Sequence, residues 1–569
     1  MNEYIVTCRS YEDLEDLYDD METPGGSLYI PDREVELVHR RTISRNTHYM
    51  LTEEEAVEIR NDERVLACER PPEDIGIYPI PYWTQTGDFN KTSGRFSSND
   101  KNWGLYRLTK NETVSNWGNA SGEEPRIQNR DIVHTASGKN VDVVIVDQHA
   151  NPDHPEFAVN PDGTGGSRVN QFNWYQYNSV LGYGNNGTYT YSTSGADPNG
   201  NHGSHVAGTA CGNTQGWARD ANIYNMAFSS SLAGSSNWST KLWDYLRHFH
   251  KNKSVNPVTG RRNPTVTNHS WGYGGSVFRD WVTSVTYRGT TTTFDGTETD
   301  TEKDNALRAA YIPSQYGWSQ PARHAATEAD MQDAMDDGVI IIAAAGNDSF
   351  YIDVPDGDDY DNTYSWSYNV EIDGVTYSDS GSYDYHRGSS PGAHPNVICV
   401  GSIGPKAAEY KSYFSNWGPR VDIWAPGSDI ISAVYDQSSA DSEGYGFLPQ
   451  DPRNSSYHLA SISGTSMATP QVCGVIACLL EQEPDLTQTE VLQHLIENSV
   501  PEVGDDGNDP NASPFTSFGS ESNNRYLFAK KKRPSTGTLS PPVLNKNRNP
   551  DSTGVKFPRV RSNRIIRDG

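Results

Sequence analysis

Three uninterrupted apolar runs most constrain how this chain can fold. They cover Val141–Val146, Val339–Ala345 and Val397–Gly401, and each has the length of one strand without polar alternation. Strands of this kind are buried on both faces, which is typical of parallel sheets covered by helices. Helical patterns alternate with such runs from about Trp103 to Phe528. The sequence therefore predicts an α/β fold with a parallel sheet flanked by helices.

Residues 1–72 carry a different pattern, which predicts a small α+β domain. Strand-like stretches and helix starts alternate through it in the order βαββαβ. The expected strands and helix-capping pairs are Tyr4–Cys8, Ser10 with Asp13, Val35–Val38, His48–Leu51, Thr52 with Glu55, and Arg64–Cys68. This order is that of a ferredoxin-like fold, in which the first and last strands lie side by side.

The remaining segments divide the chain further. Residues 73–100 are rich in Pro, Gly, Ser and Asn, and they predict an exposed linker before a large domain over 101–529. Two long polar stretches, 275–330 and 349–390, are expected to be surface insertions in that domain. Residues 530–569 lack periodicity and predict a basic, extended tail.

The distribution of charge limits the kinds of partner. The formal net charge is -28, but residues 530–569 hold eleven Lys and Arg against two Asp and Glu, so the rest of the chain holds about -37. Such an acidic body disfavours nucleic acid as its main ligand. It is typical of a soluble protein, or of one that attracts cationic segments. The partner of the basic tail is left open.

Neither a signal peptide nor a membrane span is expected. Residues 1–6 lack a basic region followed by an apolar stretch, and the chain has no run of 18 apolar residues. This favours an intracellular or particle-associated protein, for example in a virion, over a classically secreted one. The cysteines show neither zinc spacing nor a dense disulfide framework, so we expect buried free thiols. They are Cys8, Cys68, Cys211, Cys399, Cys473 and Cys478.

Two polar motifs follow the first apolar run. Asp147 ends that run, and catalytic groups gather at the carboxyl ends of strands in parallel sheets, although a carboxylate that caps the next element would also explain it. Asn201–Thr209 holds His202 and His205 among glycines and small residues at a predicted helix start. A metal site or solvated loop histidines would also explain this pair, but no HExxH motif accompanies it.

Two further motifs lie nearer the C-terminus. Gly464–Pro470 places Ser466 at the start of an apolar helix, where the helix dipole favours developing negative charge and the serine N–H can donate. A simple N-cap serine is the alternative. Ala343–Asn347 ends another apolar run in Asn347, whose amide can donate to an oxyanion.

Taken in order, these four motifs resemble those of the subtilase family of serine peptidases. The order Asp, His, Ser is that of the subtilisin type of catalytic triad. Shorter matches to the same template are Trp103–Leu105, His154–Phe157, Ser415–Pro419 and Ala425–Gly427. The resemblance covers residues 100–500 approximately and implies a subtilisin-like, doubly wound parallel sheet flanked by helices. It also implies an endopeptidase that cleaves unfolded or flexible polypeptide.

The resemblance assigns a role to each residue. Ser466 is the expected nucleophile, His202 its general base, and Asp147 the carboxylate that orients the imidazole. Asn347 and the Ser466 N–H are expected to form the oxyanion hole. A strand that would pair with an extended peptide substrate is expected to begin the binding site. The expected substrate-binding residues are Ser270, Trp271, Gly272 and Gly346.

Residues 1–72 resemble the inhibitory propeptide of the same family, mainly at Leu51–Arg60 and Arg64–Glu69. This implies a zymogen whose propeptide assists folding, then inhibits the enzyme, and is removed by self-cleavage within 73–100. A packing or regulatory domain that is never removed is the alternative.

The chain also departs from the family pattern. Gln148, His149 and Ala150 follow Asp147, where the family usually has a small hydroxyl residue and glycine, so the support of Asp147 is left open. Residues 210–219 lack the longer loop with which some members bind calcium. No metal or cofactor is expected for catalysis, and structural calcium at the Asp-rich loops 353–361 or 505–509 is left open.

These departures, the insertions and the lack of a signal peptide keep a second function in view. In it, the chain is a catalytically weak subtilase fold that serves as a structural or binding component of a larger assembly, for example a virus. The presence of all three triad residue types favours the peptidase.

Overall fold

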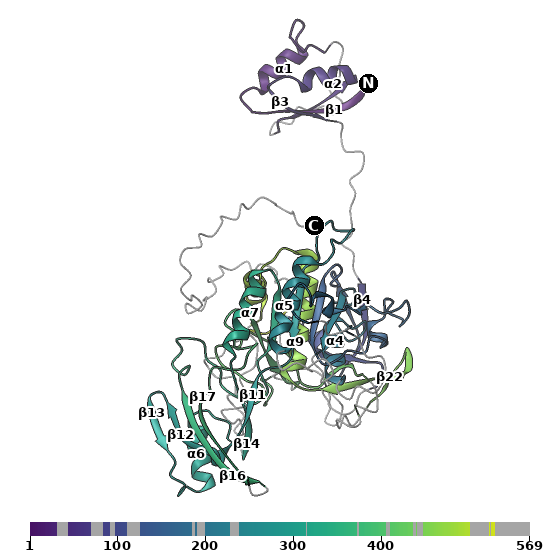
Figure 1. Ribbon diagram of the computed structural model, residues 1–569. Helices are drawn as coiled ribbons and strands as arrows, with labels where there is room; N and C mark the ends of the chain where they lie inside the picture. Colours follow the sequence, from purple (N-terminus) through teal and green to yellow (C-terminus); the bar gives the residue numbers. More distant parts are fainter. Residues whose placement is uncertain are drawn as a thin grey trace. The chain divides into compact units, whose positions relative to one another are not determined.

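The computed structural model describes two compact units, Met1–Ile80 and Pro81–Gly569 (Figure 1). The residues that it describes are 1–30, 44–69, 83–91, 97–110, 126–184, 188–189, 200–227, 238–314, 316–372, 375–405, 410–435, 440, 448–500, 523 and 525–529. Each unit has its own hydrophobic core.

The first unit is a small antiparallel sheet with two helices. Its elements are β1 (Asn2–Cys8), α1 (Leu14–Glu22), β2 (Asn46–Leu51), α2 (Glu53–Arg60) and β3 (Val65–Glu69). The strand order is β2-β1-β3, so the first and last strands lie side by side as predicted. The expected strand at Val35–Val38 falls outside the described residues.

The two predicted helix caps in this unit differ in outcome. Thr52 and Glu55 form the expected capping box, because the Thr52 hydroxyl accepts from Glu55 N and the Glu55 carboxylate accepts from Thr52 N. Ser10 also accepts from Asp13 N, but α1 begins only at Leu14. The Ser10 hydroxyl therefore closes the turn before the helix and does not cap it.

A seven-stranded parallel sheet forms the centre of the second unit, as the apolar runs predict. Its strand order is β19-β18-β15-β10-β7-β9-β8, and every neighbouring pair is parallel. The strands are β7 (Asp142–Asp147), β8 (Val169–Asn170), β9 (Asn222–Ala227), β10 (Thr265–His269), β15 (Ile340–Ala344), β18 (Ile398–Ile403) and β19 (Ile423–Pro426).

The order in which the chain visits these strands makes the sheet doubly wound. From β7 the chain builds β8 and β9 on one side, and it then crosses to build β10, β15, β18 and β19 on the other. The direction of winding therefore reverses between β7 and β10. The carboxyl ends of strands at such a reversal form the crevice where ligands bind in open α/β sheets.

Helices pack against this sheet in pairs. Helix α4 packs against α9, where Gly474 lies so close to the Ala210 carbonyl that a Cβ would come within 2.5 Å of its oxygen. Helix α5 packs against α7. The helices of this unit are α3 (Trp103–Arg107), α4 (Asn201–Cys211), α5 (Trp238–Asn252), α6 (Asp300–Ala309), α7 (Ala325–Asp336), α9 (Thr465–Gln482) and α10 (Gln488–Asn498), with the 3-10 turns η1 (Pro155–Phe157), η2 (Trp174–Tyr177) and η3 (Arg279–Trp281).

Part of the expected linker is folded, which corrects the prediction for 73–100. Strand β4 (Trp83–Asn90) is the middle strand of a sheet with β5 (Asp100–Asn102) and β6 (Arg126–His134). Phe89 is fully buried, and the Trp83 ring stacks on His134 with centroids 3.7 Å apart. Aromatic burial therefore orders a stretch whose composition alone suggests a loop.

The two expected insertions share one sheet, in which β12 pairs with β16 (Figure 1). Strand β11 (Gly274–Phe278) pairs with β14 (Gly317–Pro321), and a four-stranded sheet has the order β13-β12-β16-β17. Its members are β12 (Val282–Tyr287), β13 (Thr290–Thr293), β16 (Thr363–Ile372) and β17 (Val375–Asp384). Strands from 275–330 thus pair directly with strands from 349–390, which polar composition does not reveal.

The last described segment closes one edge of the central sheet. Arg525 O accepts from Trp424 N, and Leu527 N donates to Trp424 O, each at 2.8 Å. Tyr526 between them is fully buried under the Arg107 guanidinium. We call residues 525–529 the closing segment. Nearby, β20 (Ile430–Ala433), β21 (Gln450–Asp451) and β22 (Asn454–Ile462) form a separate sheet in the order β20-β22-β21.

All six cysteines are free thiols, five of them buried and Cys478 half-buried. Within the described ranges, no helix is both long enough and apolar enough to cross a bilayer.

Candidate active site

The predicted site residues gather where the winding of the sheet reverses. Asp147 is the last residue of β7, Ser270 follows the end of β10, and Asn347 follows β15. Since β7, β10 and β15 are consecutive neighbours in the sheet, their carboxyl ends share one edge. His202 and Ser466 each occupy the second position of a helix, α4 and α9. Fold topology alone therefore brings five distant segments to one place.

Asp147 and His202 are hydrogen-bonded. Asp147 Oδ1 lies 2.7 Å from His202 Nδ1, with the Asp147 side chain 2% exposed and the His202 side chain 28% exposed. A carboxylate on Nδ1 fixes the ring orientation and directs Nε2 away from the carboxylate. The imidazole is thus held by a buried acid while its own side chain stays accessible.

Ser466 is bound to the segment after β10. Its hydroxyl donates to the Ser270 carbonyl at 3.1 Å, and the Ser270 hydroxyl donates to the Ser466 carbonyl at 2.9 Å. The Ser466 residue is 8% exposed. These reciprocal bonds hold the first turn of α9 against the expected substrate strand. The bond to Ser270 occupies the hydroxyl proton of Ser466. Ser466 must break this bond before it can transfer the proton to an imidazole.

The Asn347 side chain is oriented by Thr465. Asn347 Oδ1 accepts from both Thr465 N and Thr465 Oγ1, each at 2.8 Å, so the Nδ2 donor points the other way. A Cβ placed on Gly464 would lie 3.5 Å from Ser466 N and 3.6 Å from Asn347 Nδ2. Both expected oxyanion donors therefore border the same space beside Gly464.

A second asparagine holds the loop that carries Asn347. Asn416 Oδ1 accepts from Asp348 N at 3.2 Å and from Phe350 N at 2.8 Å, while its Nδ2 donates to Ala345 O at 2.8 Å. Asn416 thus bonds to the backbone on both sides of Asn347. This clamp is the kind of support that an oxyanion donor needs to stay in place.

The expected substrate-binding residues follow the ends of β10 and β15. Trp271 Nε1 donates to Val146 O at 3.0 Å, which fixes the indole beside the end of β7. Gly272 is exposed, and Gly346 adopts a φ of +103° and donates to Thr465 Oγ1 at 3.3 Å. Their contact with a substrate stays a prediction.

The two histidines of the Asn201–Thr209 motif differ in environment. His205 is fully buried, and its Nε2 donates to Ile430 O at 2.8 Å. Burial lowers the pKa of His205 to about 3, so its ring is neutral at ordinary pH. His205 thus ties α4 to β20, and His202 alone faces Asp147. Across the described ranges, no three His, Cys, Asp or Glu side chains form a group suited to a metal ion.

The Asp-rich loop at 353–361 is engaged with its own backbone and with arginine. Asp353 accepts from Val354 N at 2.8 Å and from Asp359 N at 2.9 Å, and Asp359 pairs with Arg288 at 2.7 Å. Asp353 is thus occupied by backbone N–H donors, and the charge of Asp359 is paired with that of Arg288. The second Asp-rich loop, at 505–509, falls outside the described residues.

A search against protein-family models identifies the family. The model of the Subtilase family matches residues 138–523. The chain belongs to the subtilase family. As in the sequence analysis, the match takes in Asp147, His202, Asn347 and Ser466.

Curated relatives and solved structures give the degree of similarity. This subtilase is 27% identical to Subtilisin-like protease 3 of Arthroderma benhamiae over 387 residues, which are 68% of this chain and 64% of the relative. It is 25% identical to Alkaline protease 1 of Emericella nidulans, over 68% of this chain and 62% of that one. A crystal structure of a cold adapted subtilisin-like serine proteinase covers 76% of this chain and 98% of its own, with 21% identity and a TM-score of 0.42. The chain thus spans somewhat less than two thirds of these curated relatives.

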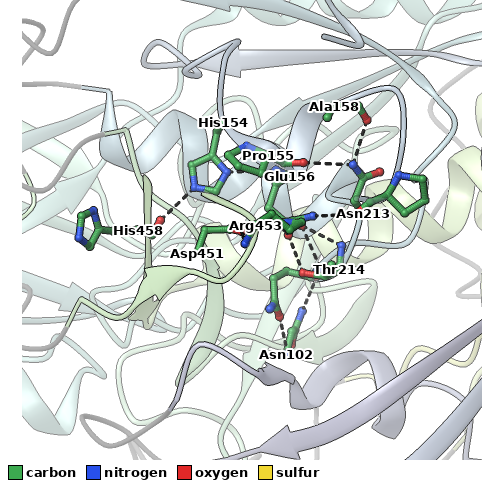
Figure 2. Close-up of polar contacts among 12 residues, drawn as sticks. Asn102, His154, Pro155, Glu156, Ala158, Asn213, Thr214, Asp451, Arg453 and His458 are labelled. Carbon is green, nitrogen blue, oxygen red and sulfur yellow. Dashed lines mark hydrogen bonds and ion pairs between the residues drawn. The ribbon is translucent and has the colours of Figure 1, made fainter. Parts of the chain in front are cut away.

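A buried ionic cluster in this subtilase contacts the loop that follows α4 (Figure 2). Glu156 is fully buried, pairs with Arg453, and accepts from Thr214 N at 3.0 Å and Thr214 Oγ1 at 2.5 Å. Burial alone would raise the pKa of Glu156, but Arg453 and the Thr214 donors outweigh it and hold the pKa at about 2. Asp451 pairs with the same guanidinium at 2.6 Å. We call Glu156, Arg453 and Asp451 the ionic cluster.

Sequence reasoning missed the supporting residues of the site. Thr465 and Asn416 hold the oxyanion side, and Gln148 lies between Asp147 and His202. Thr465 and Asn416 stand inside the motifs Gly464–Pro470 and Ser415–Pro419, and Gln148 stands out only as a departure from the family pattern. Their partners are far away in the chain, so spacing carries no signal of these contacts.

Proposed function

We propose that this subtilase is a serine endopeptidase. Ser466 is the nucleophile, His202 the general base and Asp147 the residue that orients His202. The observation that carries the proposal is the 2.7 Å bond between buried Asp147 and accessible His202, at the sheet edge that also holds Ser466.

In this mechanism the Ser466 hydroxyl leaves the Ser270 carbonyl and passes its proton to His202 Nε2 as its oxygen attacks the scissile carbonyl. Asp147 stabilises the imidazolium through Nδ1. Asn347 Nδ2 and Ser466 N donate to the oxyanion of the tetrahedral intermediate. His202 then protonates the leaving amine, and a water molecule, activated by His202 in turn, hydrolyses the acyl-enzyme.

The substrate in this proposal is an extended polypeptide. The segment Ser270–Gly272 follows β10 and is bonded to Ser466, so a peptide strand laid along it would bring its carbonyl to the nucleophile. Ser270 contributes its carbonyl to the resting site, while Trp271 and Gly272 would line the peptide. The location of the protein and the partner of its basic tail stay predictions.

We also propose that the first unit is a propeptide. It has its own sheet and core, and the chain enters the second unit before β4. Because β4 is the central strand of its sheet, we place self-cleavage upstream of Trp83. The permanent regulatory domain is the alternative outcome.

Expression of wild type and Ser466→Ala tests the proposal. We expect wild type to yield two fragments by intact mass measurement and to react with a fluorophosphonate, because Ser466 is an activated nucleophile. Ser466→Ala should yield only full-length chain and no label. The matched control is Ser463→Ala, which removes an exposed hydroxyl from the same turn and should process and label normally.

The same experiment decides between the two functions. A folded wild-type chain that takes no label would overturn the peptidase and favour the structural component. Equal fragments from wild type and Ser466→Ala, with label on wild type only, would keep the peptidase and reject self-processing.

A further inference from the structure

Gln148 touches both partners of the Asp147–His202 pair. Its backbone N–H donates to Asp147 Oδ1 at 2.7 Å, the same oxygen that receives His202 Nδ1. Its side-chain Oε1 accepts from the His202 backbone N at 3.2 Å. One half-buried residue therefore binds the carboxylate through its main chain and the histidine through its side chain.

The position of Gln148 is itself fixed. Asn225 Nδ2 donates to Gln148 O, and Asn225 Oδ1 accepts from Ala150 N, both at 3.1 Å. Gly203 lies so close to Gln148 that a Cβ there would come within 2.2 Å of the Gln148 carbonyl oxygen. The turn after β7 is thus clamped to β9 on one side and pressed against the start of α4 on the other.

The start of α4 needs such an acceptor. Gly200 occupies the N-cap and provides no side-chain hydrogen bond. The first N–H groups of a helix have no partner within the helix, and an acceptor from elsewhere must satisfy them. Gln148 Oε1 does this for His202 N, in place of an N-cap side chain.

The Asp147 carboxylate is held on one side only. Its Oδ2 is buried and accepts no hydrogen bond from the described residues. Gln148 N and His202 Nδ1 both converge on Oδ1. A rotation of the carboxylate would therefore break the bonds to Gln148 and to His202 together.

We propose that Gln148 is a positioning residue for the catalytic pair. Its side chain caps α4 and so fixes the position of His202 relative to Asp147, while its own backbone N–H fixes the Asp147 carboxylate. This rests on the proposed peptidase function. A small hydroxyl residue at this position would be too short to reach His202 N. The role therefore follows from the long amide side chain that this chain carries.

The test compares Gln148→Met and Gln148→Glu with wild type in peptide hydrolysis. Gln148→Met keeps the length of the side chain but removes the acceptor, and we expect kcat/KM to fall about tenfold, mainly in kcat. Gln148→Glu keeps the acceptor and adds a negative charge beside the imidazole. We expect it to raise the apparent pKa of the acidic limb of kcat/KM by about one unit. The control is Gln171→Met, which changes an exposed glutamine and should leave both quantities unchanged.

Each outcome is decisive. Wild-type kcat, KM and pH profile in both variants would overturn the proposal. If Gln148→Met unfolds in a denaturation experiment, Gln148→Asn decides, because it keeps an amide but shortens the side chain that reaches His202 N. Wild-type kcat in Gln148→Asn would then overturn the proposal.

If wild type takes no fluorophosphonate label, the peptidase proposal fails first. The positioning of His202 is then read from the NMR signal of its Nδ1 proton, assigned with His202→Asn. An unchanged signal and titration in Gln148→Glu would reject the role independently of activity.

Discussion

Lys411 shows how one buried cation holds a loop near the candidate site. Its ammonium donates to Ser412 O at 2.9 Å and to Ser415 O at 3.1 Å, and the residue is 3% exposed. Its acceptors in the described chain are backbone carbonyls, and no carboxylate offsets its burial. Burial lowers the pKa of Lys411 to about 7. The loop that it holds continues into Asn416, which clamps the backbone around Asn347.

This lowered pKa predicts a pH dependence of stability. The folded chain releases the Lys411 proton near pH 7, whereas an unfolded lysine releases it near 10.5. Between these values the unfolded state binds more protons, so Lys411 makes the free energy of unfolding rise with pH, by at most about 1.4 kcal/mol per unit. We expect Lys411→Met to lose this slope in urea denaturation between pH 6 and 10, at ~0.5-unit steps. Lys139→Met, at an exposed lysine, should keep it; equal slopes in all three proteins would contradict the prediction.

At the residue scale, local sequence patterns single out the candidate catalytic residues but not the residues that hold them in place. Asp147, Asn347 and Ser466 stand out because each follows an apolar run or begins an apolar helix. Gln148 and Thr465 act through bonds to residues 54 and 118 positions away. Such bonds exist only after the sheet has formed, so no local pattern encodes them.

At the scale of elements, the ionic cluster joins three separate segments. Glu156 belongs to η1, Arg453 and Asp451 to the β21–β22 turn, and Thr214 to the loop after α4. His154 adds a bond from its Nε2 to His458 O at 3.0 Å (Figure 2). The cluster therefore fastens the C-terminal end of α4, whose first turn carries His202.

Arg453→Met should destabilise the protein strongly. It leaves the buried Glu156 carboxylate without its cation, and breaking one partner of a buried pair costs about 3–5 kcal/mol. The pKa of Glu156 is about 2 in the folded state against an ordinary 4.5, so its contribution is complete above 4.5 and is lost as pH falls through 2. The difference in the free energy of unfolding between wild type and Arg453→Met should therefore be smaller at about pH 3 than at pH 7, as measured by denaturation at both values.

The control for this change is Arg387→Met. Arg387 pairs with Asp361 and Asp384 at the surface, where their side chains are 85% and 40% exposed, so its removal should cost at most about 1 kcal/mol. If Arg453→Met and Arg387→Met lose similar free energies of unfolding, the buried ionic cluster stabilises the protein no more than a surface ion pair does.

The strands that the sequence predicts correctly are those whose residues are apolar and buried along their whole length. The runs at Val141–Val146 and Val339–Ala345 became the central strands β7 and β15 because they are apolar throughout. The strands of Trp83–Asn90 and of the two insertions escaped prediction, since they are stabilised by aromatic contacts such as Trp83 on His134 and by pairing between distant segments. Composition records polarity but not which distant strand is the partner.

At the scale of the whole molecule, the second unit is completed by a segment that follows its last helix. Tyr526 and Leu527 of the closing segment are fully buried, and Ala529 N donates to Leu108 O at 2.9 Å. The segment thus joins β19 to the region of α3, more than 400 positions earlier in the chain. Nothing in its short sequence predicted this return.

A pair of truncations tests this role, both in a Ser466→Ala background that prevents self-digestion. A chain that ends at Ala529 should unfold like the full-length chain. A chain that ends at position 522 loses two fully buried side chains, each worth about 1.5–3 kcal/mol, and should be less stable by several kcal/mol in guanidinium denaturation. Equal stability of the two truncated chains would show that the closing segment adds no stability.

The closing segment also protects the edge of the central sheet from pairing with other molecules. While Arg525 and Leu527 occupy the hydrogen-bonding groups of Trp424, that border of the sheet offers no template to a strand from another molecule. A nick that released this segment would expose the backbone N–H and C=O of Trp424 on the edge strand, together with the apolar surface that Tyr526 covers. We therefore expect molecules cleaved before the closing segment to aggregate while still folded, and intact molecules to remain monodisperse at high concentration.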